Sequence, residues 1–282
     1  MKKHIVTIAA AITITAGLTA GCGGGGSTSA TSATVSGAVA DGYLVGATVF
    51  LDKNGNYQLE AGEPSTTTDA NGSYTLTVDP ADVGNYPIVA LAVKGVTIDK
   101  DTNQPVQSSY ILSMPRDSVS GTVSSNFISP MSTQIRELMA TGKYNMQQAM
   151  DLMSSKLGLP AGTNMLANYL ANPNSANNQA MHNAAQNMAS LMGSQMGQVL
   201  TNSGSTTTVD VNRYRGMMGT IFSNMSSLRG TGTSTQSNMT TLMGTMATSL
   251  PGIPAGQSYR NMSTAFRGGM MGGATGGGMM HN

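Results

Sequence analysis

The chain has 282 residues, of which 39% are hydrophobic and only 10% charged, and its formal net charge is +1. This near-neutral balance excludes the basic surface of a typical nucleic-acid-binding protein, and three histidines with one cysteine leave little for histidine-based catalysis or a structural zinc site. The aromatic content is low and Ser, Thr, Asn and Gly are abundant, which is more typical of an exported protein than of a cytosolic one.

The first residues have the pattern of an export signal. Two lysines precede an apolar run over 5–16, and small residues then lead to Cys22. This pattern predicts a secretory signal peptide over 1–21, and the apolar run is too short to span a bilayer. The stretch resembles a bacterial lipobox, with Thr19 where a large aliphatic residue is usual. Cys22 is therefore the expected lipidation site, and the alternative is ordinary cleavage that leaves a free thiol.

The Gly, Ser, Thr and Ala residues of 22–33 cannot bury a core, so this segment is predicted to be a flexible tether. No aspartate follows Cys22 directly, which by the usual sorting logic favours the outer membrane, on its cell-surface or periplasmic face. The lipid chains would be the membrane partner, without a transmembrane helix.

Composition divides the rest of the chain near Pro130. Ten acidic and four basic residues lie between Cys22 and Pro130, whereas three acidic and eight basic residues follow, together with 21 of the 23 methionines. The interpretation is an α+β chain of two domains: a β domain over 34–129 and a methionine-rich helical domain over 130–250. A Gly/Met-rich flexible tail is expected over 251–282.

The first of these regions is predicted to be an antiparallel β-sandwich. Short runs rich in Val, Ile, Thr and Tyr alternate with turn residues, and Asn71-Gly72 is a strong tight-turn signal. The expected strands are 34–39, 47–51, 66–68, 73–78, 88–98, 109–113 and 119–123.

Four motifs in this region resemble the carboxypeptidase regulatory-like domains and the collagen-adhesin B-type repeats. They are Val35-Ser36-Gly37, Asp41-Gly42-Tyr43-Leu44, Gly46-Ala47-Thr48-Val49 and Thr68-Asp69-Ala70-Asn71-Gly72-Ser73-Tyr74. The resemblance covers about 34–98 and implies a transthyretin-like sandwich with a structural or binding role. That family's sandwich has no catalytic residues to carry over.

An acidic loop between two expected strands is a candidate calcium site. On the pattern of the twelve-residue calcium loop, the ligands at positions 1, 3, 5, 7, 9 and 12 would be Asp52, Asn54, Asn56, the Gln58 backbone carbonyl, Glu60 and Glu63. This spacing gathers hard oxygen donors, which Ca²⁺ prefers, although Tyr57 stands where the pattern has glycine. Related adhesin repeats bind calcium with a similar loop. The hypothesis is a weak extracellular-type site, and the alternative is a hydrated acidic hairpin.

The second region is predicted to be a helical bundle. Its expected helices are 130–141, 145–157, 163–171, 175–201, 210–229 and 235–249, with Ser129-Pro130, Asn145 and Gly158 as start and stop signals. Three groups of methionines repeat at steps of three, four and seven residues, and such steps place them on one helix face. They are Met139, Met146, Met150 and Met153; Met181, Met188, Met192 and Met196; and Met239, Met243 and Met246.

These stripes favour a bundle core that uses methionine in place of leucine, and the alternative is a surface that repacks against partners. Segments at 128–133, 157–163 and 181–186 resemble a helical region that follows such β modules in bacterial surface lipoproteins. That resemblance concerns architecture and location, and it implies no activity.

The tail raises a separate hypothesis. Thioethers and imidazole are suitable ligands for Cu(I). The candidate copper ligands are Met270, Met271, Met279, Met280 and His281. The alternative is a tail of biased composition with no metal.

The sequence has no nucleophile elbow, phosphate-binding glycine loop, His-Glu-x-x-His motif or cysteine pair, and His182 fits a half-buried helix position better than a ligand. We therefore expect no enzyme. The expected function is that of an outer-membrane lipoprotein acting as an adhesin-like surface module or an envelope structural module, with a protein or polysaccharide partner and no nucleic acid. A Met-rich protein that handles copper(I) is the alternative.

Overall fold

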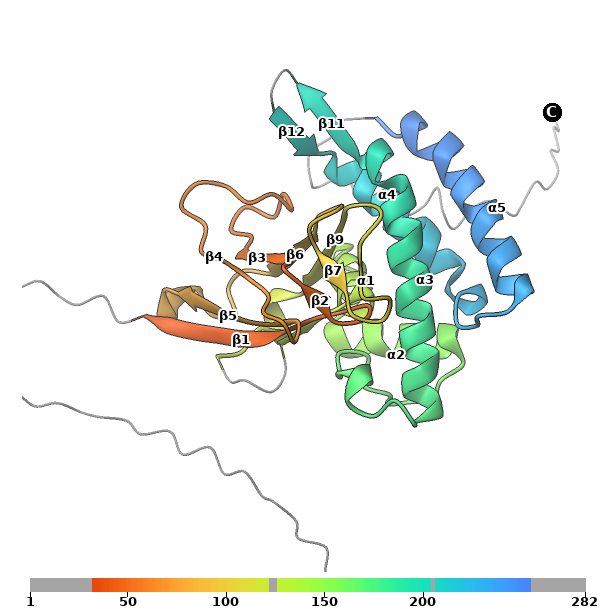
Figure 1. Ribbon diagram of the computed structural model, residues 1–282, viewed down its shortest axis with the longest axis horizontal. Coiled ribbons are helices and arrows are strands. Elements are labelled where there is room, and N and C mark those ends of the chain that lie inside the picture. The colour runs from red at the N-terminus through yellow and green to blue at the C-terminus, as the bar shows by residue number, and fades with distance from the viewer. Residues whose placement is uncertain (1–31, 122–125, 204–205, 255–282) are drawn as a thin grey trace, which may run out of the picture. The chain divides into compact units, whose positions relative to one another are not determined.

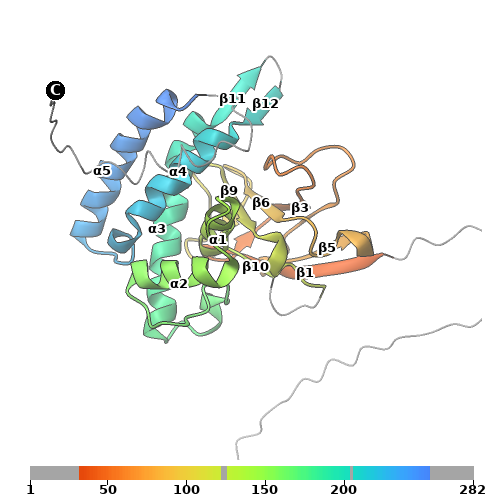
Figure 2. The ribbon, with the colours of Figure 1, turned by 180° about the vertical axis from the view of Figure 1, so that it is seen from behind.

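A computed structural model of the chain describes residues 32–121, 126–203 and 206–254, and every structural statement below concerns these ranges. Ten short strands precede five α-helices, and a further two-stranded hairpin lies between the third and fourth helices. Helix α3 (Ala176–Val199) stands between the first ten strands and α5 (Thr233–Ser249) (Figures 1 and 2). The α+β class expected from the sequence is confirmed.

The strands form several small sheets. Four antiparallel strands run in the order β4 (Ser65–Thr67), β3 (Thr48–Leu51), β6 (Ile88–Ala92) and β9 (Tyr110–Met114). Three run in the order β10 (Asn126–Ile128), β1 (Ala33–Val39) and β5 (Ser73–Val78). A smaller sheet joins β2 (Leu44–Val45), β7 (Ile98–Asp99) and β8 (Gln104–Pro105), and β11 (Leu200–Ser203) pairs with β12 (Thr206–Val209).

Burial along the strands reflects what covers each face. Strand β5 alternates exposed and buried residues, because only one of its faces meets the core. Every residue of β9 is buried, because helix α1 (Pro130–Ala140) packs on this strand as well as on β10. Strand β10 runs parallel to β1, and a Cβ at Gly37 would lie 1.9 Å from the Asn126 carbonyl oxygen. Only glycine allows this approach.

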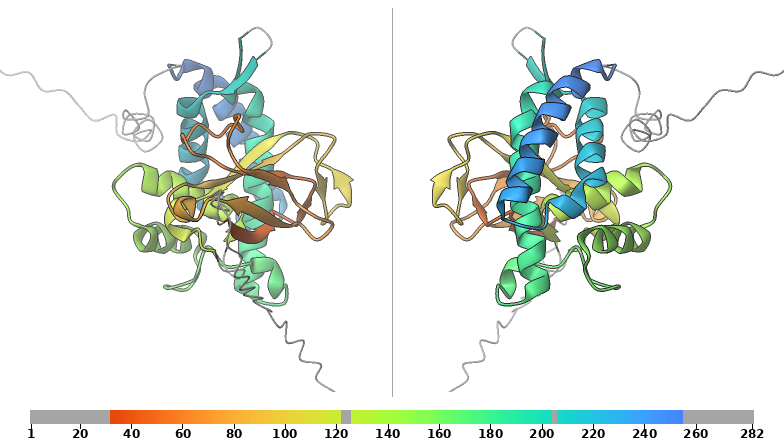
Figure 3. Two further views of the ribbon diagram at one scale, coloured as in Figure 1. Left: turned by 90° about the vertical axis from the view of Figure 1, so that its left-hand side faces the viewer. Right: turned by 90° about the vertical axis from the view of Figure 1, so that its right-hand side faces the viewer.

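Local signals define several helix ends as the sequence predicted. Helix α2 (Met146–Leu157) begins at a reciprocal capping box between Asn145 and Gln148, and it ends at Gly158 in the left-handed conformation. Helix α1 begins at a second capping box, between Ser129 and Ser132. The remaining helices are α3 (Ala176–Val199), α4 (Val211–Ser223) and α5 (Thr233–Ser249), and α5 packs on α3 and α4 (Figure 3).

Most of the striped methionines are core residues. Met153, Met181, Met188, Met192, Met196, Met239 and Met246 are buried, whereas Met139, Met146, Met150 and Met243 pack at the margin of the same cluster. The burial predicted for these stripes is therefore confirmed. The buried apolar residues of the strands and helices all belong to one hydrophobic cluster.

Polar side chains also fasten the helices to β9. Ser132 Oγ donates to the Ser113 carbonyl at 2.7 Å, and Thr133 Oγ1 accepts from the Ser113 amide at 2.8 Å. The Tyr214 hydroxyl of α4 donates to the Ile111 carbonyl at 2.9 Å. The segment at 128–133 thus connects α1 to β9.

Five of the predicted elements were wrong in detail. The strand expected over 88–98 ends at Ala92, where a turn closed by Thr97 and containing Gly95 at φ 74° leads into β7. Instead of a strand, a 3-10 turn precedes Val119, and residues 122–125 lie outside the described ranges.

The helix expected over 163–171 is reduced to a 3-10 turn at Tyr169–Ala171. Here the side chains of Asn164 and Asn168 accept hydrogen bonds from amides two residues ahead, and these bonds compete with helical ones. The α3 helix ends at Val199, before Thr201, because the chain turns into the unpredicted hairpin of β11 and β12. The helix expected over 210–229 ends at Ser223, and a separate 3-10 turn over Met225–Ser227 follows it.

Candidate functional site

The acidic loop after β3 is closed around the Asp52 carboxylate. Its Oδ1 accepts hydrogen bonds from the amides of Gly55 and Asn56 at 2.9 and 3.0 Å, and its Oδ2 accepts from the Tyr57 amide at 3.3 Å. Tyr57 has φ 65°, so the residue at position 6 of the calcium pattern adopts the left-handed turn for which glycine is usual. The side chain of Tyr57 is buried, and we infer that this burial holds the unusual backbone conformation in place.

The other predicted ligands of the loop also bond to one another. The Glu60 carboxylate accepts from the Nδ2 groups of Asn54 and Asn56 at 2.8 and 2.7 Å. Glu63 accepts from the amides of Lys53 and Glu60 at 2.8 and 3.0 Å. The Asn56 Oδ1 accepts from the Gln58 amide at 2.9 Å. The structure thus brings all six predicted residues into one closed hydrogen-bonded loop.

The fit of this loop to a cation is partial. Within the described residues no group of three or more acidic, histidine or cysteine side chains converges closely enough to hold a metal ion. The NH₂ groups of Asn54 and Asn56 point at Glu60, where a cation would need their oxygens. Their oxygens accept instead from the amides of Asn56 and Gln58, so each side chain would have to release that bond and turn in order to ligate Ca²⁺. Carboxylate and amide oxygens are nevertheless the type of donor that Ca²⁺ prefers.

Beneath the loop lies a cluster of buried charges that the sequence analysis missed. Asp52 is fully buried, and its Oδ2 accepts from Arg136 Nη2 at 2.8 Å. The Arg136 guanidinium lies 4.2 Å from the centre of the Tyr57 ring. The Tyr57 hydroxyl donates a short hydrogen bond to Glu137, which also accepts from Arg215 Nε at 3.3 Å.

This buried cluster joins three parts of the chain: the loop, α1 and α4. Its four ionisable side chains, those of Asp52, Arg136, Glu137 and Arg215, are at most 6% exposed, and their formal charges cancel. Burial raises the pKa of the Tyr57 phenol, which therefore stays protonated and donates to Glu137. Removal of any one charged residue from this balanced cluster is expected to destabilise the fold, because the remaining buried charge would be uncompensated.

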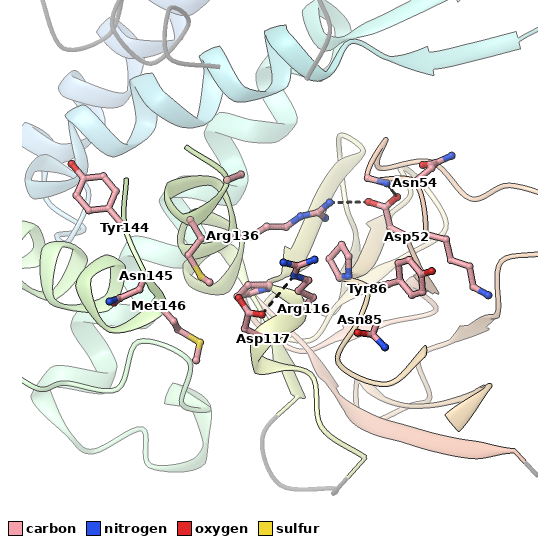
Figure 4. A pocket seen from close by; sticks show the side chains of 16 residues that line it. Asp52, Asn54, Asn85, Tyr86, Arg116, Asp117, Arg136, Tyr144, Asn145 and Met146 are labelled. Carbon is pink, nitrogen blue, oxygen red and sulfur yellow. Dashed lines mark hydrogen bonds and ion pairs between the residues drawn. The ribbon is translucent and has the colours of Figure 1, made fainter. Parts of the chain in front are cut away.

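A cleft opens beside the first residues of the loop (Figure 4). Its volume is about 760 Å³, and Asp52 and Arg136 belong to its lining. In the view of Figure 4, Tyr86 and Asn85 lie on one side of Arg116 and Arg136, and Tyr144 lies on the other. The Arg116 side chain is 65% exposed, and its Nε is 3.6 Å from Asp117.

A second polar group links the β7–β8 turn to α3. Asp101 Oδ2 accepts from His182 Nε2 at 2.6 Å and from Gln186 Nε2 at 2.8 Å, and the imidazole stacks on Tyr169. The hydrogen bond from His182 lowers the pKa of Asp101. The half-buried helix position expected for His182 is confirmed, and its motif fastens α3 to the strands.

Asp41 lies near this group and is buried. Its Oδ2 accepts from the Tyr110 hydroxyl at 3.0 Å, and its Oδ1 has no hydrogen-bond partner among the described residues. Burial, reinforced by the charge of Asp99, raises the pKa of Asp41 to about 7. The carboxyl therefore takes up a proton near neutral pH.

Other predicted sites lie outside the described residues. They are the lipidation site at Cys22 and the copper ligands Met270, Met271, Met279, Met280 and His281. Across the described ranges, no helix is both long enough and apolar enough to cross a membrane.

No protein-family model, curated protein or solved structure matches the chain. The resemblance to the adhesin-type repeats therefore rests on the sequence motifs alone.

Proposed function

We propose that this chain is an exported, lipid-anchored protein of the outer membrane that acts as a calcium-stabilised binding module of the cell envelope. Its partner would be a protein or a polysaccharide of the envelope or matrix. The signal-like segment ending at Cys22 supports export and anchoring. The motifs of residues 34–98 support a relationship of the strands to transthyretin-like sandwiches. A helical domain would follow from Pro130 onward.

The closed loop over 52–63 is the observation that carries the proposal. Six residues at the spacing of a calcium loop bond to one another there, and Tyr57 adopts the backbone conformation that this loop requires. Asp52 also accepts a hydrogen bond from Arg136 of α1, so the position of the loop is coupled directly to that helix. Ca²⁺ in this loop would stabilise the cleft beside it, because Asp52, Asn54 and Gly55 belong to both.

Thermal unfolding of the mature chain with and without Ca²⁺ tests the proposal. For a site with a Kd of ~10⁻³ M, ten times that concentration stabilises the folded state by about 1.4 kcal/mol. This corresponds to a rise in Tm of roughly 3–6 °C for a chain of this size. Mg²⁺ at the same concentration is the ionic control.

Glu60→Gln is the diagnostic variant, because Glu60 is exposed and lies away from the buried cluster. It removes one hard ligand charge, so we expect most of the calcium-dependent rise in Tm to disappear. Asp151→Asn is the matched control, since it removes one exposed carboxylate from α2. Equal responses of the two variants to Ca²⁺, or no response of the unaltered chain, would refute the calcium site.

A further inference from the structure

The cleft of Figure 4 has a lining suited to an anionic sugar. We propose that it binds a carboxylate-bearing segment of an acidic polysaccharide. This inference rests on the proposed binding function and names the class of its partner. It follows from the unused donors in the cleft, from its aromatic and amide side chains, and from its size.

Two arginines make the cleft a donor surface. Arg136 is 6% exposed, and its Nη1 has no hydrogen-bond partner among the described residues, although its Nη2 is bound to Asp52. A buried guanidinium nitrogen without an acceptor is costly, so an acceptor there is favoured. Arg116 is largely exposed, and its 3.6 Å approach to Asp117 is longer than a charge-assisted hydrogen bond. A ligand carboxylate that displaces Asp117, which also lines the cleft, would be held by the planar Arg116 fork through two parallel hydrogen bonds.

The remaining lining is typical of a site for sugars. Tyr86 and Tyr144 are half-buried, and each offers an apolar ring with a polar tip. The C–H face of a pyranose packs on such a ring, while its hydroxyl groups need neighbours that both donate and accept. Asn145 Nδ2 supplies donors and Asn85 Oδ1 an acceptor, because the other side-chain amide atom of each residue is already bonded, to Gln148 and to Ala81 respectively.

An acidic peptide fits the cleft less well than a sugar. Apart from the two tyrosine rings, the apolar part of the described lining consists of prolines, methionines and one alanine, and no strand edge of the sheets belongs to it. Peptides usually bind along strand edges or through apolar anchor residues. The cleft volume lies in the ~300–1,000 Å³ range of small-ligand sites, which suits a short oligosaccharide segment.

Calorimetric titration of the mature chain with hexagalacturonate tests the proposal. The methyl-esterified hexamer is the control for the carboxylates, and hexaglutamate is the control for acidic peptides. Each titration is run in chelator and again with Ca²⁺, since the sugar itself binds this ion. We expect saturable binding of hexagalacturonate and at least tenfold weaker binding of the other two.

Variants locate the binding. Arg116→Gln removes an exposed guanidinium, and we expect about tenfold weaker binding, as for the loss of a charge-assisted hydrogen bond. Tyr144→Ala tests the stacking surface and should weaken binding by a similar factor. Lys94→Gln is the matched control, because Lys94 is an exposed cation outside the cleft. The affinity of Lys94→Gln for hexagalacturonate should stay within twofold of that of the unaltered chain.

Three results would overturn the proposal. The first is absence of hexagalacturonate binding, the second is equal binding of the ester or of hexaglutamate, and the third is equal weakening by Arg116→Gln and Lys94→Gln. None of these results bears on the calcium site, which the Tm measurements test separately. If Ca²⁺ stabilises the chain but hexagalacturonate does not bind, the proposed function stands and the acidic-polysaccharide site is wrong.

Discussion

Removal of Arg136 is the sharpest test of the buried charge cluster. Arg136→Met keeps an unbranched side chain of similar length but leaves the Asp52 carboxylate fully buried with only backbone donors. Breaking a buried ion pair from one side costs about 3–5 kcal/mol, because the remaining charge loses its compensation. For a chain of this size the corresponding fall in Tm is roughly 6–20 °C.

Two further variants separate charge from packing. Arg116→Met removes an exposed arginine, and it should cost less than about 1 kcal/mol. Asp52→Asn combined with Arg136→Met removes both charges, so part of the lost stability should return. We also expect Ca²⁺ to stabilise Arg136→Met more than the unaltered chain, because the Asp52 charge is no longer shared with a guanidinium.

Circular dichroism melts at neutral pH, with and without Ca²⁺, measure all four proteins. The reasoning would be wrong if Arg136→Met melted within about 2 °C of Arg116→Met. It would also be wrong if the double variant were less stable than Arg136→Met alone, since the loss would then come from packing and not from an uncompensated charge.

Three other predictions concern groups outside this cluster. The folded-state pKa of Asp41 is about 7, above its ordinary value of 3.8. The protonated carboxyl therefore stabilises the fold below pH 4, by at most about 4 kcal/mol, and this stabilisation is lost as the pH rises to 7. Asp41→Asn should therefore gain stability relative to the unaltered chain between pH 4 and 7 in urea titrations, and a constant difference would contradict this assignment. Asn145→Ala removes the cap of α2 and should cost about 1 kcal/mol, with faster amide exchange in the first turn of that helix; unchanged exchange would argue against the cap. His182→Ala removes the hydrogen bond that lowers the pKa of Asp101, so an NMR titration should find that pKa moved up toward its ordinary value, whereas an unmoved pKa would show that the contact is weak.

The elements that the sequence determined by itself are those whose decisive hydrogen bonds are local. Asn145 and Gln148 cap α2 from three residues apart, and Gly158 ends that helix alone. The loop over 52–63 is equally local, because its side chains bond within about ten residues of one another. Spacing along the chain was therefore enough to find both the helix and the candidate calcium loop.

Local pattern failed where two tendencies compete over a few residues. Residues 163–171 carry helix-forming side chains, yet Asn164 and Asn168 bond to nearby amides and stop the helix. The turn at Gly95 interrupts a run of strand-forming residues in the same way. Such outcomes depend on small energy differences that residue preferences alone do not resolve.

Only the tertiary structure decided which polar residues would be buried together. Asp52 meets Arg136 across 84 positions of the chain, Tyr57 meets Glu137 across 80, and Asp101 meets His182 across 81. On sequence alone, Arg136 and Glu137 are ordinary helix residues with no sign of burial. Their partners are set by the packing of α1 on β9, which also forms the cleft beside Asp52. This packing removes distant charges from water at one place, where each needs a compensating group.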